Sequence, residues 1–397
     1  MLSSKTSKIN ISVEDSFEQY HNRKLVYFNK KTKIYLKNEE INYSIMKENK
    51  ILIKVVSISL NPIDLLIKNS IPRFSSFERP ICSDYAGIIV DVGKVQEEKG
   101  WKIGQSVCGN LLNSISKGTA VEYLCIDPDK EPNIVNFDPN VVDYNVAAGW
   151  PTVSSIAYVV INGFQRKREK EENKKEDGEK RETLGKEAKS IDEDRNILVI
   201  GGSTSVGMIA IQLAKNIGKF NKVVTMCSKE GFGLAESLGA DHCVEYHNKQ
   251  ELRQELIRIS SDIKYDLIFD CVGNKDLFKY INEIMKPKET GSKYVTIVGD
   301  SKSNYEEGFK LRALISPGVR LIGSQLGHHS VNFNYWIQVG KPSDSMWLKD
   351  VIELIETGKL KVPVDSVYKF EEFQEAFDRL SKSVAKGKII LRVAETV

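Results

Sequence analysis

The chain has 397 residues, of which 41% are hydrophobic and 28% charged, and this balance predicts two soluble domains with cores of their own. A formal net charge of +3 is too small to indicate nucleic-acid binding, and no apolar run reaches the roughly 18–20 residues that a membrane span needs. The six cysteines form no Cys-x-x-Cys pair, which favours reduced thiols in an intracellular, cytoplasmic protein.

The first domain, residues 1–162, consists of short strand-like stretches and turns that predict a partly open β-barrel. Residues 51–60 are rich in β-branched side chains and predict a strand, which Asn61 and Pro62 end by starting a short helix. Further strand signals lie at 85–93, 104–109 and 118–126. A helix is predicted over 146–161, with Pro151 inside its first turns.

Residues 163–195 are predicted to form a charged, flexible insertion. Positions 166–195 hold eleven basic and eleven acidic residues and almost no apolar ones. Zero net charge argues against a polybasic membrane or nucleic-acid patch, and this composition cannot pack a core.

The stretch from 197 to 218 reads ILVIGGSTSVGMIAIQLAKNIG: a buried strand, a small-residue turn and a helix with Gly218 as its expected C-cap. This order is typical of a dinucleotide-binding unit, where a helix N-terminus holds a pyrophosphate. Ser205 replaces the usual middle glycine, and a positive φ there would cost about 1–2 kcal/mol. The alternative is a turn that binds nothing. The turn's candidate cofactor-binding residues are Gly201, Gly202, Ser203, Thr204, Ser205, Val206 and Gly207.

Strands and helices then alternate, which predicts a doubly wound parallel sheet of the Rossmann type over residues 196–325. Further strands are expected at 222–227, 241–246, 266–270, 294–298 and 321–324. The segments that end these strands add Tyr246, Val272, Gly273 and Gly299 to the candidate cofactor-binding residues. Residues 326–397, with helices at 346–356 and 371–380 and a strand at 388–393, are expected to return to the first domain.

The end of the second strand predicts which dinucleotide is bound. An acid there selects NAD by accepting from the ribose 2′-OH, whereas this strand ends in Met226, Cys227, Ser228 and Lys229. The hydroxyl and the ammonium favour the 2′-phosphate of NADP(H). The alternative is an exposed lysine that contacts no cofactor.

Several motifs resemble the medium-chain dehydrogenase/reductase superfamily in its zinc-independent quinone oxidoreductase branch: LNPIDLLIK at 60–68, SDYAGIIVDVG at 83–93, SLGAD at 237–241 and DLIFDCVGN at 266–274. STSV at 203–206, CSK at 227–229 and VDSVYKF at 364–370 resemble the Yim-type proteins of budding yeasts more closely. The resemblance implies a GroES-like first domain and an α/β architecture for the chain as a whole. It also implies a location at lipid droplets or mitochondria.

The same resemblance places Asn61 and Ser83 where the superfamily's alcohol dehydrogenases have zinc ligands. Neither residue type binds zinc, so no metal is expected. Asn61 is the candidate catalytic residue, a donor to a carbonyl or to the nicotinamide region, although it also suits the N-cap of the helix that Pro62 begins. Leu66 and Ile156 replace the Tyr and Thr of the quinone oxidoreductases.

Two functions remain open at this stage. The first is an NADPH-dependent reductase of quinones or α,β-unsaturated carbonyl compounds, with a small apolar substrate in a cleft between the domains. The second is a catalytically degenerate relative that acts as a binding or interaction protein at lipid droplets or mitochondria. Neither involves nucleic acid or a transmembrane segment, and a homodimer is left open.

Overall fold

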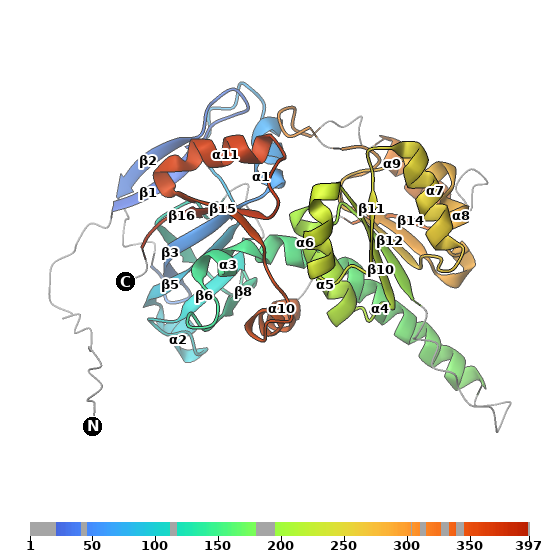
Figure 1. The fold of residues 1–397 in the computed structure, drawn as a ribbon. Helices are drawn as coiled ribbons and strands as arrows, with labels where there is room; N and C mark the ends of the chain where they lie inside the picture. Colours follow the sequence, from blue (N-terminus) through green and yellow to red (C-terminus); the bar gives the residue numbers. More distant parts are fainter. Residues whose placement is uncertain are drawn as a thin grey trace, which may run out of the picture.

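The structure is a computed structural model that describes residues 21–40, 46–111, 117–179, 195–302, 304–309, 315–326, 333–338 and 345–395, with the backbone alone described from 166 to 179. These residues form two lobes that lie side by side (Figure 1). The first lobe takes its strands from both ends of the chain, and the second takes them from the middle. The predicted fold class, a barrel-like β lobe beside a doubly wound parallel sheet, is confirmed.

The first lobe is organised around strand β3 (Ile51–Leu60), of which nine of ten residues are buried. A strand covered on both faces needs a nearly continuous apolar sequence, which explains the strong signal of this stretch. It pairs in antiparallel fashion with β5 (Asp84–Val92), β7 (Tyr123–Ile126) and β16 (Lys388–Arg392). Further strands of this lobe are β1 (His21–Tyr27), β2 (Tyr35–Glu40), β4 (Arg79–Pro80), β6 (Ser106–Asn110), β8 (Ile134–Asn136) and β15 (Val364–Lys369). Its helices include α1 (Pro62–Ser70), α2 (Lys94–Glu98), α3 (Tyr144–Gly149) and α11 (Phe373–Ser381).

The second lobe is a parallel sheet with the strand order β11-β10-β9-β12-β13-β14, the doubly wound order of dinucleotide-binding domains. Its strands are β9 (Asn196–Ile200), β10 (Lys222–Cys227), β11 (His242–Glu245), β12 (Leu267–Asp270), β13 (Lys293–Thr296) and β14 (Tyr335–Ile337). Its helices include α5 (Ser205–Asn216), α6 (Phe232–Ser237), α7 (Lys249–Ser260), α8 (Ile281–Ile284) and α9 (Ile315–Gln325).

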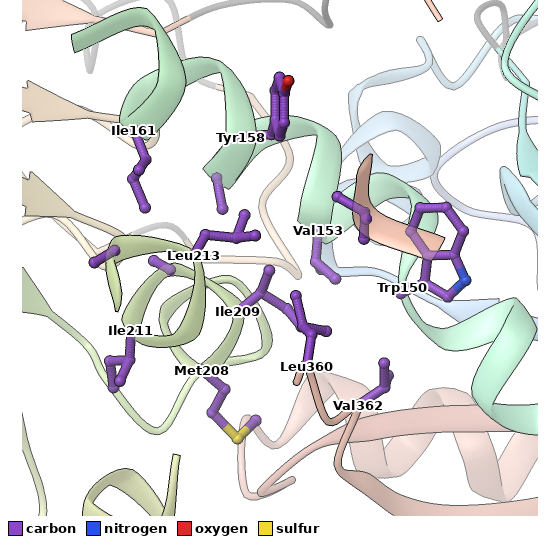
Figure 2. Close-up of a cluster of buried hydrophobic side chains, with 14 of the residues drawn as sticks. Trp150, Val153, Tyr158, Ile161, Met208, Ile209, Ile211, Leu213, Leu360 and Val362 are labelled. Carbon is purple, nitrogen blue, oxygen red and sulfur yellow. The ribbon is translucent and has the colours of Figure 1, made fainter. Parts of the chain in front are cut away.

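Alternate residues of each strand belong to different cores, because successive side chains of a strand point to opposite faces. Ile197 and Val199 of β9 pack in a cluster with residues of α5 and of the first lobe. Leu198 and Ile200 pack in a second cluster with residues of α7 and α8. Figure 2 shows the first of these clusters, where α4 (Pro151–Glu179) packs across α5. The same cluster includes Trp150 and residues of the first lobe, so the two lobes share one apolar core.

The single helix predicted over 146–161 is wrong in two respects. The chain forms α3, breaks at Trp150 and continues as α4, because Pro151 has no backbone N–H to join the preceding turn. Helix α4 then runs through residue 179, into the segment predicted to be a flexible insertion. Its far end projects away from the two lobes (Figure 1). Residues 180–194 of the predicted insertion lie outside the described residues.

The strand predicted at 321–324 is also wrong, because these residues belong to helix α9. A short apolar run does not distinguish a strand from a helix by its period. The sixth strand of the sheet is β14, which pairs in parallel with β13. The sheet therefore continues past residue 325, where the dinucleotide-binding domain was expected to end. Helix α10 (Met346–Glu356) has the predicted bounds and packs against α4.

The predicted insertion, 163–195, includes residues at both of its ends that pack against the second lobe. Phe164 is buried and stacks on Phe220 with 5.9 Å between ring centroids. The Arg195 guanidinium lies over the Phe220 ring and donates to the Gln165 side chain.

Replacing residues 166–194 by a short Gly/Ser linker is expected to leave the melting temperature nearly unchanged. The segment's composition cannot bury apolar surface, and each doubling of a loop costs only about 0.6 kcal/mol of closure entropy. Replacing 163–195 is expected to lower the melting temperature, since that change also removes Phe164 and Arg195. Calorimetry of the two variants compares them directly. Equal melting temperatures for both would show that this packing contributes nothing.

No helix among the described residues combines the length and the apolar character that crossing a membrane requires.

Candidate cofactor and active site

The turn between β9 and α5 has the conformation that its small residues suggest. Gly201 has a φ of +90°, a left-handed backbone that favours glycine, and its N–H donates to the carbonyl of Met226 at 2.8 Å. Thr204 is the N-cap of α5, and its hydroxyl accepts from the N–H of Gly207 at 3.1 Å. The helix therefore starts at Ser205 with its N-terminus, and the positive end of its dipole, at the turn.

Two glycines of this turn are required by close packing. A Cβ on Gly202 would lie 1.9 Å from the Thr225 hydroxyl oxygen, and one on Gly207 would lie 2.1 Å from the carbonyl oxygen of Gly201. The strain expected at Ser205 does not arise, because Ser205 is the first residue of α5 and has helical backbone.

The glycine predicted as the C-cap of α5 has a different role. Helix α5 ends at Asn216 with Ile217 as its C-cap, and the left-handed residue beyond it is Lys219, with a φ of +50°. A Cβ on Gly218 would instead lie 2.7 Å from the Phe220 ring. Gly218 is therefore needed for close packing.

The other candidate cofactor residues lie at the same edge of the sheet, because parallel strands end at one side. Tyr246 follows β11, Val272 and Gly273 follow β12, and Gly299 follows β13. Val272 contacts the turn directly, since a Cβ on Gly201 would lie 2.5 Å from it. The carboxyl edge of an open parallel sheet is where such folds bind ligands. The structure thus places Val272 against the turn and the other candidates at the same edge of the sheet.

Asp270 at the end of β12 holds the loop that contains Val272 and Gly273. Its carboxylate accepts from the backbone N–H of Val272 at 3.0 Å, Gly273 at 2.8 Å and Asn274 at 2.8 Å, and from the Tyr294 hydroxyl at 2.7 Å. Burial raises the pKa of Asp270 although these four hydrogen bonds act in the opposite direction. The loop is therefore positioned by a buried side chain beneath it.

The end of β10 also carries an acid, Glu230, two positions beyond Ser228. Ser228 is half-buried and starts a short 3₁₀ turn, Lys229–Gly231, in which Lys229 and Glu230 are exposed. A hydrogen bond from the Ser228 hydroxyl is the first cause that holds the pKa of Glu230 below its usual range, and Lys386 and His247 add to it. The strand end thus offers a hydroxyl, an ammonium and a carboxylate.

Asn61 lies in the first lobe within a buried polar network centred on Asp84. One carboxylate oxygen of Asp84 accepts from Asn61 Nδ2 at 2.8 Å and from the Ser59 hydroxyl at 2.9 Å. The other oxygen accepts from the Thr152 backbone N–H at 2.9 Å and from the Thr152 hydroxyl at 2.6 Å. Lys388 Nζ donates to Asn61 Oδ1 at 2.6 Å and lies 3.5 Å from the same carboxylate.

This network fixes the orientation of the Asn61 amide. Lys388 can only donate and the Asp84 carboxylate only accepts, so the amide oxygen faces the first and the amide nitrogen the second. Asp84 is fully buried, and Asn61 and Lys388 are each 2% exposed. Burial lowers the pKa of Lys388, although Asp84 and Asp64 raise it in part. Asn61 is also the N-cap residue of α1, and its backbone N–H donates to Asp64 at 2.7 Å.

The residues that depart from the quinone oxidoreductases, and the one at the second zinc position of the alcohol dehydrogenases, are packed. Leu66 is buried, and Ile156 packs against the core cluster that the lobes share. Ser83 is buried, with its hydroxyl 3.3 Å from that of Thr152. Among the described residues, no three His, Cys, Asp or Glu side chains are grouped so as to hold a metal ion.

Three functional candidates were missed from the sequence: Glu230, Lys386 and Lys388. Glu230 stands two positions beyond Ser228, so its carboxylate is a signal that lies in the sequence at the end of β10. The two lysines lie more than 150 positions from Ser228, and nothing local in their sequence signals that they approach these sites.

Comparisons with known proteins show which family and which solved folds this chain resembles. The family described as "Alcohol dehydrogenase GroES-like domain" matches residues 47–131, and the family described as "Zinc-binding dehydrogenase" matches residues 238–391. Among curated relatives, Protein YIM1 of Vanderwaltozyma polyspora is 33% identical over 387 residues, which cover 93% of this chain and 98% of the relative.

Solved structures with the same fold include two quinone oxidoreductases. The enzyme of Coxiella burnetii is 20% identical with a TM-score of 0.69, and the comparison covers 94% of this chain and 100% of the other. The Escherichia coli enzyme, determined in complex with NADPH, is 18% identical with a TM-score of 0.63, covering 94% of this chain and 100% of the other.

Proposed function

We propose a function from the premise that this chain belongs to the medium-chain dehydrogenase/reductase family as a quinone oxidoreductase-like, Yim-type protein. It is an NADPH-dependent and zinc-independent reductase. Its substrates are quinones or α,β-unsaturated carbonyl compounds. Family members with a Rossmann-type domain bind a nicotinamide cofactor, and the Escherichia coli neighbour carries NADPH.

The observation that carries this proposal is the contact between the cofactor turn and the segment that precedes β16. Ser205 of the turn donates its hydroxyl hydrogen to the carbonyl of Gly387 at 3.2 Å. The next residue, Lys388, donates to Asn61. Two consecutive residues, Gly387 and Lys388, thus connect the cofactor turn of one lobe to the candidate catalytic residue of the other.

The chain's own residues divide the work of binding and orientation. The N-terminus of α5 and the close-packed turn suit the pyrophosphate. Val272, Gly273 and Gly299 line the same edge. Tyr246, with 46% of its surface exposed, stacks on His247 with one face of its ring. When bound there, NADPH supplies a hydride equivalent. Asn61, oriented by Asp84 and Lys388, is proposed to donate a hydrogen bond to the acceptor's carbonyl oxygen or to the nicotinamide amide.

The residues at the family's zinc positions do not fit a zinc ion. Asn61 and Ser83 present an amide and a hydroxyl, whereas zinc is bound by Cys, His, Asp or Glu side chains. The amide is already held by Asp84 and Lys388, and the buried ammonium beside it would repel a divalent cation. These features support a reaction in which no metal polarises the substrate.

Packing of Leu66 and Ile156 in place of polar side chains favours the second candidate, a relative that binds the cofactor without catalysis and serves as an interaction protein at lipid droplets or mitochondria. Steady-state oxidation of NADPH across a panel of quinones and enals distinguishes the two. Turnover with at least one acceptor supports the reductase. Measurable NADPH binding without turnover of any acceptor favours the interaction protein.

NADPH is expected to raise the melting temperature more than NADH does at equal concentration, because tighter binding to the native state adds stability in proportion to RT ln(1 + [L]/Kd). Replacing Lys229 by alanine is expected to reduce this difference in melting temperature. Because Lys229 is an exposed charge, its loss should weaken NADPH binding by about 1.5- to 5-fold. Thermal shift measurements with both cofactors provide the test. Equal protection of the wild type by the two cofactors would remove the argument for a phosphate site at Ser228 and Lys229.

A further inference from the structure

The segment around Lys386, which belongs to the first lobe, lies against the cofactor edge of the second. Gly387 accepts a hydrogen bond from Ser205 of the turn, and Lys386 Nζ lies 3.5 Å from the backbone carbonyl oxygen of Glu230. Lys386 therefore reaches the end of β10, where the ribose of a bound dinucleotide is expected.

The backbone of this segment is anchored. The N–H of Lys386 donates to the Asp365 carboxylate at 2.9 Å, and the Arg379 guanidinium donates to the same oxygen at 2.8 Å. Gly387 has a φ of +145°, and a Cβ there would lie 2.6 Å from the carbonyl oxygen of Pro363. Lys386 thus leaves the first lobe at a defined point and extends toward the second.

The charges at the end of β10 oppose one another. Ser228 and Lys229 suit a phosphate, but the carboxylate of Glu230 repels one and suits a free 2′-OH. Lys386 and His247 both attract the Glu230 carboxylate. An additional cation at this position offsets the acid.

We propose that Lys386 binds the 2′-phosphate of NADPH together with Ser228 and Lys229, and that Glu230 opposes this phosphate. The balance between Lys386 and Glu230 then determines the preference for NADPH over NADH. This inference rests on the cofactor site of the proposed function but requires no reduction reaction. Because Lys386 comes from the first lobe, a bound 2′-phosphate links the two lobes, whereas NADH lacks this link.

Calorimetric titration of the full-length protein with NADPH, NADH, 2′,5′-ADP and 5′-AMP tests the proposal. Lys386→Ala is expected to weaken binding of NADPH and 2′,5′-ADP by about fivefold or more, and binding of NADH and 5′-AMP by less than about twofold. Glu230→Gln is expected to strengthen NADPH binding by a few-fold. Lys382→Ala removes an exposed lysine four residues earlier and is the matched control, with all four affinities unchanged.

An equal effect of Lys386→Ala on all four compounds, or none, would overturn the proposal, as would weaker NADPH binding by Glu230→Gln. The reductase function is judged separately. Selective loss of 2′,5′-ADP binding in Lys386→Ala, with no turnover of any acceptor by the wild type, refutes the reductase and supports this inference. NADPH turnover with a KM that Lys386→Ala does not change supports the reductase and refutes this inference.

Discussion

Replacing Asp84 by alanine is expected to lower the free energy of unfolding by about 3–5 kcal/mol, because the Lys388 ammonium then remains buried without its carboxylate partner. The two groups lie 3.5 Å apart, and Asp84 is fully buried. The substitution also removes the acceptor for Ser59, Asn61 and Thr152. Urea unfolding followed by tryptophan fluorescence measures the loss.

A double-mutant cycle separates the ion pair from the rest of the network. Lys388→Met removes the buried ammonium, so Asp84→Ala combined with Lys388→Met is expected to cost less than the sum of the two single changes. Additive costs, or a cost of Asp84→Ala below about 1 kcal/mol, would mean that the pair is not coupled as its geometry indicates.

The Asp84→Ala variant is also expected to recover part of its stability as the pH rises. Burial lowers the pKa of Lys388 below its ordinary value of 10.5, so the unfolded chain binds this proton more tightly than the folded protein does. Between the lowered pKa and 10.5 the free energy of unfolding therefore rises with pH, whereas below that window the full penalty applies. Losing Asp84 lowers the Lys388 pKa further. The loss in free energy of unfolding relative to wild type should be smaller at about pH 9.5 than at about pH 7. The variant that combines Asp84→Ala with Lys388→Met should show no such recovery.

Replacing Gly207 by alanine is expected to abolish NADPH binding and to lower the free energy of unfolding by about 1–3 kcal/mol, the usual cost of overpacking. The new Cβ would lie 2.1 Å from the Gly201 carbonyl oxygen, which belongs to the backbone and can yield only if the whole turn moves. Fluorescence titration with NADPH and thermal unfolding measure the two effects.

Gly233→Ala is the matched control for this prediction. Gly233 lies in helix α6, and a Cβ there would meet nothing within 4 Å. Alanine in a helix is favoured over glycine by up to about 1 kcal/mol, so this variant should be as stable as wild type or more stable, with unchanged NADPH binding. Wild-type NADPH affinity in Gly207→Ala would show that the turn does not hold the cofactor.

The sequence predicted well those elements whose signal is local. Strands β3, β9 and β10 are continuous apolar or β-branched runs bounded by turn residues, and their predicted bounds agree with the structure to within a residue. The turn after β9 was recognisable because its glycines are required by backbone conformation and packing, which leave a trace in the residue types themselves.

The features that were missed depend on contacts between distant parts of the chain. The apolar pair Leu321 and Ile322 is too short to show whether its period is that of a strand or of a helix. The helix that contains it begins six residues earlier. Asn61 was identified as a candidate, but its partner Lys388 is 327 positions away, and only the pairing of β16 with β3 brings them together. Cys82 has a φ of +70°, a left-handed backbone that favours glycine and that composition does not reveal.

The pairing of β16 with β3 also has a consequence for synthesis on the ribosome. All the described strands of the second lobe have been made once residue 337 has emerged. The first lobe has made β3 long before, but β16, which pairs with residues 57–60 of β3, is complete only at residue 392. During that interval Asp84 has no Lys388 beside it, and residues 57–60 of β3, which pair with β16, are open to pairing with other chains. The lobe whose first strands are translated early can therefore complete its sheet only after its last strands have been made.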